Sequence, residues 1–154
     1  MSGDGSDLQD LYQEVILDHN KRPHNFRAIE GGVKAEGHNP LCGDRVTVFL
    51  RLENGRVADV SFQGSGCAIS KASASLMTDS VKGKTLDEVN ALFERFQAMI
   101  TRAPDAPAEQ PGELGKLTVL AGVRQFPMRV KCASLPWHTL RSAAAATDDV
   151  VSTE

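Results

Sequence analysis

The sequence has no long apolar run and no run of basic residues, and each absence excludes a class of protein. No hydrophobic stretch approaches the length of a membrane-spanning helix, so we expect no membrane association. The formal net charge is -3, and no cluster of Lys and Arg could neutralise a phosphate backbone, so nucleic acid is not an expected partner. The acidic and polar residues 1–10 also lack the composition of a secretory signal or a transit peptide.

Cysteine is scarce as well, since the chain contains only Cys42, Cys67 and Cys132. Three cysteines cannot all pair within one chain, which disfavours a disulfide scaffold and favours metal binding or thiol chemistry. Their separation does not follow a zinc-finger or zinc-ribbon pattern, so spacing alone is weak evidence for a metal. We expect a cytoplasmic protein, because thiols stay reduced in that compartment.

The remaining composition is that of a globular protein. Hydrophobic residues make up 41% of the chain and charged residues 24%, which argues against disorder. We expect a single domain over residues 1–154. Within it, residues 101–122 are expected to form an excursion that begins with a Pro-rich linker, and residues 147–154 a flexible tail.

An antiparallel hairpin is predicted in the first half of the chain. Residues 45–52 largely alternate between apolar and polar side chains, as a strand with one buried face does. Asn54-Gly55 follows, and this pair between two alternating runs is a strong hairpin signal. The return strand covers residues 56–63, and one of its faces carries Ala58, Val60 and Phe62. The hairpin would bring the first two cysteines to one end of the sheet, because they flank its two strands.

Helices are predicted where apolar residues recur at helical spacing. They cover residues 7–20, 68–81 and 86–100, with a shorter helix over 113–122. Thr85 and Glu88 form a capping-box sequence at the start of the third of these helices. His19 and His24 flank the end of the first helix and are expected to be capping or surface groups.

The third cysteine is expected at the start of a last helix. Pro136 would break a helix interior but is tolerated in the first turn, so the helix should begin at Ala133 or Ser134. Cys132 would then lie at a helix N-terminus, where the helix dipole and the neighbouring Lys131 both favour a thiolate.

A carboxylate lies two residues from the first cysteine, within the stretch 39–44, which reads Asn-Pro-Leu-Cys-Gly-Asp. If the chain enters a strand here, alternate side chains leave the same face, so Cys42 and Asp44 would point together. Three thiolates and one carboxylate would suit a borderline-soft, tetrahedral ion such as zinc. The hypothesis is a zinc site made by this pair with Cys67 and Cys132.

Each of these residues also has a simpler interpretation. A lone cysteine is usually a small core residue, although none of the three lies on an obvious apolar stripe. Asp44 alone is more often a turn residue or a cap, and His38 could be a ligand but is more simply a solvated loop histidine. Arg129 and Lys131 could be ordinary solvated charges, or they could stabilise the anionic sulfur of Cys132.

Four ordered motifs span most of the chain. They are residues 11–19 with Pro23 and Asn25, residues 39–44, residues 64–70, and residues 129–133 with Trp137. Together they resemble the U-type iron–sulfur assembly family over roughly residues 7–146. The resemblance implies an α+β fold of the NifU-like and IscU-like kind, in which a small antiparallel sheet of about three strands packs against several helices.

Two features are similar to the SufU branch of this family. Lys131 stands where IscU scaffolds carry a histidine, and the stretch Thr101 to Gly122 lengthens the segment between the second and third cysteines. The resemblance implies a zinc-dependent sulfurtransferase that accepts sulfur from a SufS-type cysteine desulfurase. It also implies four zinc ligands, namely Cys42, Asp44, Cys67 and Cys132.

The resemblance further implies that Cys42 is the sulfur acceptor. Its thiolate would attack the outer sulfur of a persulfide on the desulfurase, and the sulfur would pass to a downstream iron–sulfur scaffold. Because a zinc-bound thiolate is a blunted nucleophile, a histidine of the desulfurase would replace Cys42 on the metal at docking. Two alternatives remain open: a scaffold on which an iron–sulfur cluster is assembled and transferred, and a purely structural zinc module.

Overall fold

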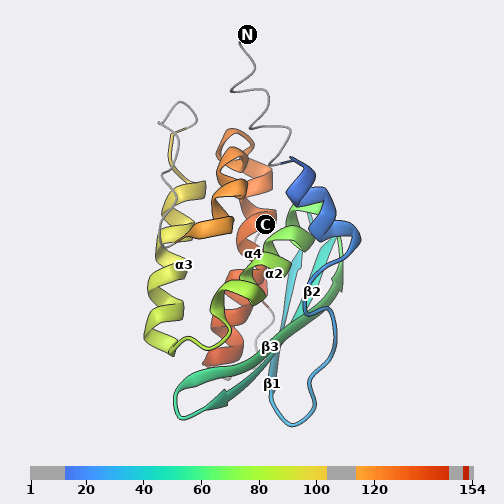
Figure 1. The fold of residues 1–154 in the computed structure, drawn as a ribbon. Coiled ribbons are helices and arrows are strands. Elements are labelled where there is room, and N and C mark those ends of the chain that lie inside the picture. Colours follow the sequence, from blue (N-terminus) through green and yellow to red (C-terminus); the bar gives the residue numbers. More distant parts are fainter. Residues whose placement is uncertain (1–12, 104–113, 146–150, 153–154) are drawn as a thin grey trace.

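A four-stranded sheet with helices packed against one face forms the framework of the protein (Figure 1). The computed structural model describes residues 13–103, 114–145 and 151–152. Three neighbouring strands are antiparallel: β1 (Val33–Asn39), β2 (Asp44–Glu53) and β3 (Arg56–Ser65). The two-residue strand β4 (Val151–Ser152) adds to β1 in parallel, and the other residues of the predicted tail lie outside the described residues. The predicted α+β class is confirmed.

The hairpin of β2 and β3 forms as predicted but contains a β-bulge. Arg51 pairs with Asp59. The next pair joins Leu52 to Val57, so Ala58 is an extra residue on β3. Such an insertion changes which side chains face the core. Val57 is buried while Ala58 is half-buried, so the prediction that Ala58 shares one face with the buried Val60 and Phe62 is wrong.

Strand β1 has no clear signal in the sequence. Its inward-facing residues are Ala35, Gly37 and Asn39, which are small or polar and give no alternation of large apolar side chains. Helix α4 (Pro127–Ala144) crosses this strand closely, and a Cβ on Gly37 would lie 3.0 Å from Leu135 Cδ1. The close approach of the helix selects small side chains here, which removes the pattern by which a strand is recognised.

Helices α2 (Ala68–Val81) and α3 (Leu86–Ile100) match two of the predicted helices. Both hydrogen bonds of the predicted capping box are present. The Glu88 N–H donates to Thr85 Oγ1 at 3.2 Å, and the Thr85 N–H donates to Glu88 Oε1 at 3.0 Å. These helices are predictable because their signals are local: an apolar stripe, a cap and a punctuating turn.

Two predicted segments are described in part. Residues 13–21 of the first predicted helix are helical, and the preceding residues lie outside the described residues. The predicted short helix is a 3-10 helix, η1 (Gly115–Gln125), with two fully buried leucines. The second half of the predicted excursion therefore packs into the core, while residues 104–113 lie outside the described residues.

The last helix, α4, begins at Pro127, so the prediction of a start at Ala133 or Ser134 is wrong. Pro127 occupies the first turn, where its missing N–H is not needed for a helical hydrogen bond. Pro136 lies inside the helix, where it cannot donate to the carbonyl four residues earlier. Tertiary packing offsets this cost, since the adjacent Trp137 stacks on two phenylalanine rings of α3.

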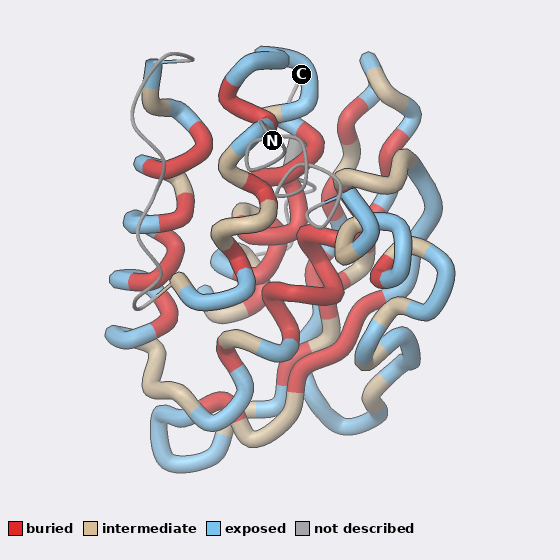
Figure 2. Tube along the Cα trace, turned by 45° about the horizontal axis from the view of Figure 1, so that its top comes forward, coloured by how far each residue is buried: buried red, intermediate tan, exposed pale blue. Residues whose placement is uncertain are grey.

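The hydrophobic core lies between the sheet and helices α2 and α4, with α3 and η1 against the outer side of the helices. In Figure 2 the buried segments run through the middle of the molecule, and the exposed segments form its outer turns. Several large side chains in this core are less than 2% exposed, among them Trp137, Phe62, Phe96, Leu50 and Met77. Across the described ranges, no helix is both long enough and apolar enough to cross a membrane.

Candidate metal centre

Four elements meet at one end of the sheet, and each supplies one residue of the predicted site. Cys42 lies in the turn between β1 and β2, and Asp44 is the first residue of β2. Cys67 is the N-cap of α2, and Cys132 lies in the second turn of α4. Because β2 and β3 are antiparallel, the start of one strand lies beside the end of the other, as the hairpin prediction requires.

The donor atoms of three of these residues cluster tightly, and Cys67 adjoins this group through Asp44. One ligand atom from each of Cys42, Asp44 and Cys132 lies within 4.8 Å of the other two. Cys67 Sγ lies 3.8 Å from Asp44 Oδ2, and the Cys67 N–H donates to Asp44 Oδ1 at 2.8 Å. The structure thus brings together the four residues that the sequence singled out, with three sulfur donors and one carboxylate.

The thiol of Cys42 is positioned by a turn and not by strand alternation. Cys42 precedes the first residue of β2, so the predicted geometry, in which both side chains leave one face of a strand, is wrong. The Cys42 N–H donates to the Asn39 carbonyl at 3.3 Å, which closes the turn. Gly43 then has φ +71°, a left-handed conformation that glycine adopts without steric cost.

The backbone before Cys67 passes directly over Asp44. A Cβ on Gly66 would lie 3.0 Å from both Cα and Cγ of Asp44, and φ at this glycine is +150°. No other residue type fits this close approach without displacing the carboxylate. The close approach over Asp44 is therefore the structural reason for Gly66 directly before Cys67.

Burial and mutual hydrogen bonding separate the acidities of the thiols. The pKa of Cys67 is lowered to about 6, chiefly by the hydrogen bond from Cys132, while burial acts in the opposite direction. The pKa of Cys132 is raised, first by the hydrogen bond with Cys67 and then by burial. The prediction that Cys132 is a thiolate at a helix N-terminus is therefore wrong for the metal-free chain, because this thiol is fully buried inside α4.

Two basic residues, Arg129 and Lys131, lie near Cys132 in sequence, and both are exposed. The pKa of Arg129 is raised, chiefly by its hydrogen bond to Cys132 and then by the charge of Cys67, so the guanidinium lies against the sulfur cluster. Arg129 therefore has an electrostatic contact with the cluster, as its predicted supporting role requires.

The donor set fits a divalent metal ion. Asp44 and Cys132 are both fully buried, and the raised pKa of Cys132 beside Cys67 indicates that ionising both of these thiols is unfavourable without a cation. Three sulfurs and one carboxylate oxygen are ligands that tetrahedral zinc accepts, and thiolates also suit iron–sulfur centres. Cys42 and Cys67 are half-buried, so the centre faces the surface on one side.

The histidines of the described residues lie outside this cluster. His38 is on β1, where it pairs with Arg45, and it is not among the grouped donors. His19 is buried, and its Nδ1 lies 2.6 Å from Ser75 Oγ, so the expectation of a capping or surface group is wrong. Burial lowers the pKa of His19, with a smaller contribution from the charge of His24. The contact between His19 and Ser75 joins the N-terminal helix to α2.

Asn39 is a site residue for which the sequence analysis gave no role. It is fully buried, and its Nδ2 lies 3.7 Å from Cys132 Sγ. The signal that could have found it is a polar residue at the end of a buried strand, directly before a cysteine-bearing turn. Such a residue must satisfy its hydrogen bonds within the protein.

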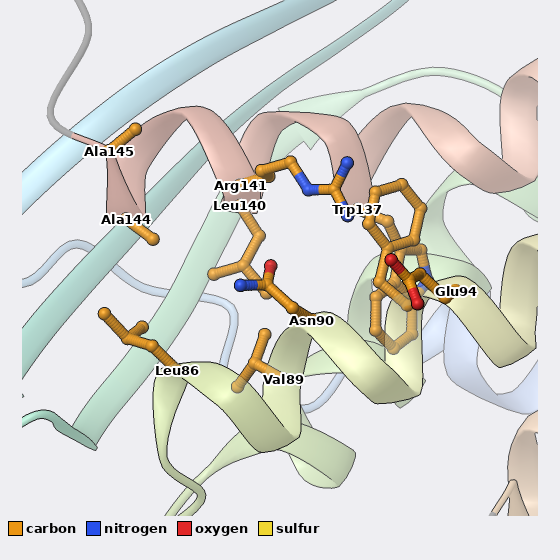
Figure 3. Close-up of a pocket in the computed structure, with 10 residues that line it drawn as sticks. Leu86, Val89, Asn90, Glu94, Trp137, Leu140, Arg141, Ala144 and Ala145 are labelled. Carbon is orange, nitrogen blue, oxygen red and sulfur yellow. The ribbon is translucent and has the colours of Figure 1, made fainter.

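Among the hollows on the described surface, two lie against α4. A cavity of about 400 Å³ lies between α3 and the C-terminal half of α4, and Figure 3 shows the side chains that line it, including Arg141 and Trp137. A larger groove of about 650 Å³ lies beside the metal centre, between the N-terminal helix, η1 and the start of α4, and Ile69 and Arg129 line it. The larger groove adjoins the cysteine cluster through Arg129, which hydrogen bonds to Cys132, but none of the four candidate ligands lines it.

Comparisons with known proteins agree with this arrangement. Residues 11–133 match the family described as the NifU-like N terminal domain. A relative from Streptococcus pyogenes serotype M1, named iron–sulfur cluster assembly scaffold protein IscU, is 41% identical over 138 residues, covering 90% of this chain and 85% of the relative.

Another relative carries the other name of the family. The protein of Bacillus subtilis strain 168, named zinc-dependent sulfurtransferase SufU, is 36% identical over 140 residues, covering 91% of this chain and 93% of its own. Among solved structures, an iron–sulfur cluster assembly scaffold protein for the SUF system, from Fervidobacterium islandicum AW-1, superposes with a TM-score of 0.76. That structure is 35% identical in sequence, and the match covers 84% of this chain and 93% of the solved one.

Proposed function

The chain belongs to the NifU-like N-terminal domain family and functions in iron–sulfur cluster assembly. Within this process, we propose that it is a zinc-dependent sulfur acceptor. It takes persulfide sulfur from a SufS-type cysteine desulfurase, stimulates that enzyme, and passes the sulfur to a downstream iron–sulfur scaffold. The main supporting observation is that Cys42, one of the three sulfur donors that gather around Asp44, is half-buried and lies on a turn. The named SufU relative supports the same role.

Four residues would hold the ion, namely Cys42, Asp44, Cys67 and Cys132. When bound, zinc supplies positive charge that keeps the thiols deprotonated at neutral pH. The chain itself contributes a buried carboxylate held by the Cys67 N–H and a guanidinium, that of Arg129, against the sulfurs. The N–H orients the carboxylate, and the guanidinium offsets part of the negative charge of the sulfurs.

In the transfer step, the Cys42 thiolate attacks the outer sulfur of the cysteine persulfide on the desulfurase. A new S–S bond forms at Cys42 Sγ, the S–S bond within the donor persulfide breaks, and the desulfurase cysteine leaves as a thiolate. The reaction exchanges one thiolate for another, so it needs no external oxidant or reductant. The turn suits this role, because Cys42 lies outside any helix or strand and, unlike Cys67, does not cap a helix.

The test combines metal analysis with a desulfurase assay. We expect one zinc per chain in protein purified without added metal, stimulation of the desulfurase by the wild-type protein, and none by Cys42→Ala. His38→Ala is the matched control, because His38 is close in sequence but outside the cluster. Normal stimulation by the Cys42→Ala protein would show that the acceptor has been assigned to the wrong residue.

A second candidate function is a scaffold on which an iron–sulfur cluster is assembled and transferred. The relative from Streptococcus pyogenes with 41% identity is named as such a scaffold, and three thiolates with a carboxylate also suit a [2Fe–2S] cluster. A coloured cluster that transfers to an apo-protein would favour the scaffold, whereas stoichiometric zinc favours the acceptor. A purely structural zinc module would stimulate no desulfurase and would unfold on chelation.

A further inference from the structure

Asn39 makes three hydrogen bonds at the candidate metal centre. One reaches Cys132 on α4, and two lie within the turn that carries Cys42. We propose that Asn39 is a positioning residue that donates a hydrogen bond to the sulfur of Cys132 while its oxygens hold the turn that carries Cys42. The proposal rests on the metal binding included in the proposed function. It adds a residue that does not bind the ion but fixes two residues that do.

The position of Asn39 in the fold brings it to three of the four candidate ligands. It is the last residue of β1, and its partner across the β1–β2 ladder is Asp44. Its backbone carbonyl accepts the Cys42 N–H at 3.3 Å. Its side chain reaches α4, where Nδ2 lies 3.7 Å from Cys132 Sγ. Asn39 and Cys132 are both fully buried, so water does not compete for these contacts.

The orientation of the Asn39 amide is fixed by its other contact. The Leu41 N–H lies 3.2 Å from Asn39 Oδ1, and a backbone N–H can only donate, so the oxygen end of the amide must face Leu41. The NH2 end therefore faces Cys132 Sγ. Pro40 lies between the two and has no N–H, so the side-chain oxygen bonds the next available donor and forms an Asx-turn.

An ordinary turn residue explains only half of this arrangement. An Asx-turn requires the Asn39 oxygen, and Asp or Ser at this position would supply one equally well. It does not require an N–H group directed at a buried sulfur. That donor has a purpose where the sulfur is a thiolate, because a hydrogen bond to it withdraws negative charge and lowers the repulsion among three sulfurs and Asp44.

Residues that hydrogen bond to metal ligands influence metal affinity measurably. Loss of such a partner typically weakens metal binding by roughly 10- to 100-fold. We expect a loss in this range for Asn39→Ala, which removes both side-chain contacts. Asn39→Asp keeps an oxygen for Leu41 but places a second oxygen against the sulfur, so its zinc affinity should fall at least as far.

The experiment measures zinc affinity by competition with a chromophoric chelator for the wild type, both variants and the control His38→Ala. The same proteins loaded with Co²⁺ report on the sulfur directly, through the thiolate-to-metal charge-transfer band. Loss of a hydrogen bond to sulfur should move this band to lower energy in both Asn39 variants. A residue that only supports the turn would change stability without moving the band.

A measurement on the wild-type protein covers the case in which the variants do not fold. In protein loaded with ¹¹³Cd²⁺, the N–H···S–Cd path should give a scalar coupling between the Asn39 side-chain amide protons and cadmium. Presence of this coupling supports the proposal. Its absence, or an unchanged zinc affinity and charge-transfer band in both variants, overturns it.

The outcomes also separate this inference from the proposed function. Failure of the wild-type protein to bind Zn²⁺ or ¹¹³Cd²⁺ in stoichiometric amount would remove the metal centre, and both ideas would fall together. Tight binding by the wild type with no cadmium coupling at Asn39 would leave the metal centre intact and remove only the positioning role.

Discussion

Cys42 and Cys132 donate sulfur to the same cluster from two unlike regions of the molecule. Cys42 lies on a turn at the surface and is half-buried, and the neighbouring Leu41 is 58% exposed. Cys132 lies within α4, has no exposed surface, and is followed by residues that pack into the core. The first region can present a thiol to another protein, whereas the second cannot do so without unfolding.

This difference suggests a division of labour within one donor set. Cys132 and Asp44 form the fixed part of the donor set, because α4 and the sheet hold them in place. The turn is the part of the centre that can exchange partners, because its position depends on a few hydrogen bonds and not on core packing. The predictions that follow test this contrast, beginning with the change expected to have the largest effect.

Replacing Cys132 or Cys42 with serine should show different losses of zinc affinity for the buried and the half-buried ligand. Cys132→Ser should weaken zinc binding by more than about 100-fold, beyond the loss typical of residues that only hydrogen bond to ligands. Cys42→Ser should lose less affinity, because water can reach the half-buried position and complete a four-coordinate site. Chelator competition measures both, and equal losses would contradict the proposed contrast.

The close passage of Gly66 over Asp44 gives the next largest effect. Gly66→Ala adds backbone strain and a clash with the carboxylate, so we expect a loss of about 3–5 kcal/mol in the free energy of unfolding. Gly31→Ala is the matched control, since Gly31 also has positive φ but open space around it, and should cost about 1–2 kcal/mol. Denaturant titration compares the two, and a similar cost for both would refute the clash.

Acid should loosen the N-terminal segment through His19. The pKa of this buried histidine is lowered in the folded chain, so the unfolded chain binds more protons as the pH falls. Its stabilising contribution is complete above the unfolded pKa of about 6.5 and is lost as the pH falls toward the folded pKa. His19→Gln should therefore flatten part of the acid slope of stability between about pH 7 and pH 5.

A residual slope is expected in the His19→Gln protein, because burial also lowers the pKa of His138. Hydrogen exchange of the amides in residues 13–21 would show whether the lost stability is local to the N-terminal helix. An acid slope unchanged by the substitution would mean that His19 does not titrate within this range in the folded protein.

The smallest effect is expected at Lys131. This residue is exposed on α4, so Lys131→Ala should change the free energy of unfolding by less than about 0.5 kcal/mol and leave zinc affinity near that of the wild type. Arg129→Ala should weaken zinc binding more, because Arg129 hydrogen bonds to Cys132. The reverse order of the two losses would restore the role that the sequence suggested for Lys131.

The successful predictions depend on signals that lie within a few residues. Asn54-Gly55 fixes the hairpin, and the Thr85 and Glu88 pair fixes the start of α3. Once the hairpin is known, the meeting of Asp44 with Cys67 follows from antiparallel pairing alone. Local chemistry thus predicts much of the sheet and half of the metal centre.

The failures have a common cause, which is packing between distant segments. Strand β1 carries small residues because α4 lies over it, and the buried partner of His19 is more than fifty positions away, at Ser75. The start of α4 was misplaced because Pro136 is accommodated by stacking of Trp137 on α3. None of these contacts leaves a periodic trace in the sequence.

Cys67 serves two purposes with one atom. Its sulfur accepts the Ser70 N–H at 3.5 Å and so caps the first turn of α2, and the same sulfur faces Asp44 in the cluster. Alkylation or oxidation of Cys67 would therefore damage the ligand set and fray the beginning of α2 in a single event. Redox injury at this thiol would be read out as a change in helix content as well as a loss of metal, which links the chemical state of the centre to the folding of α2.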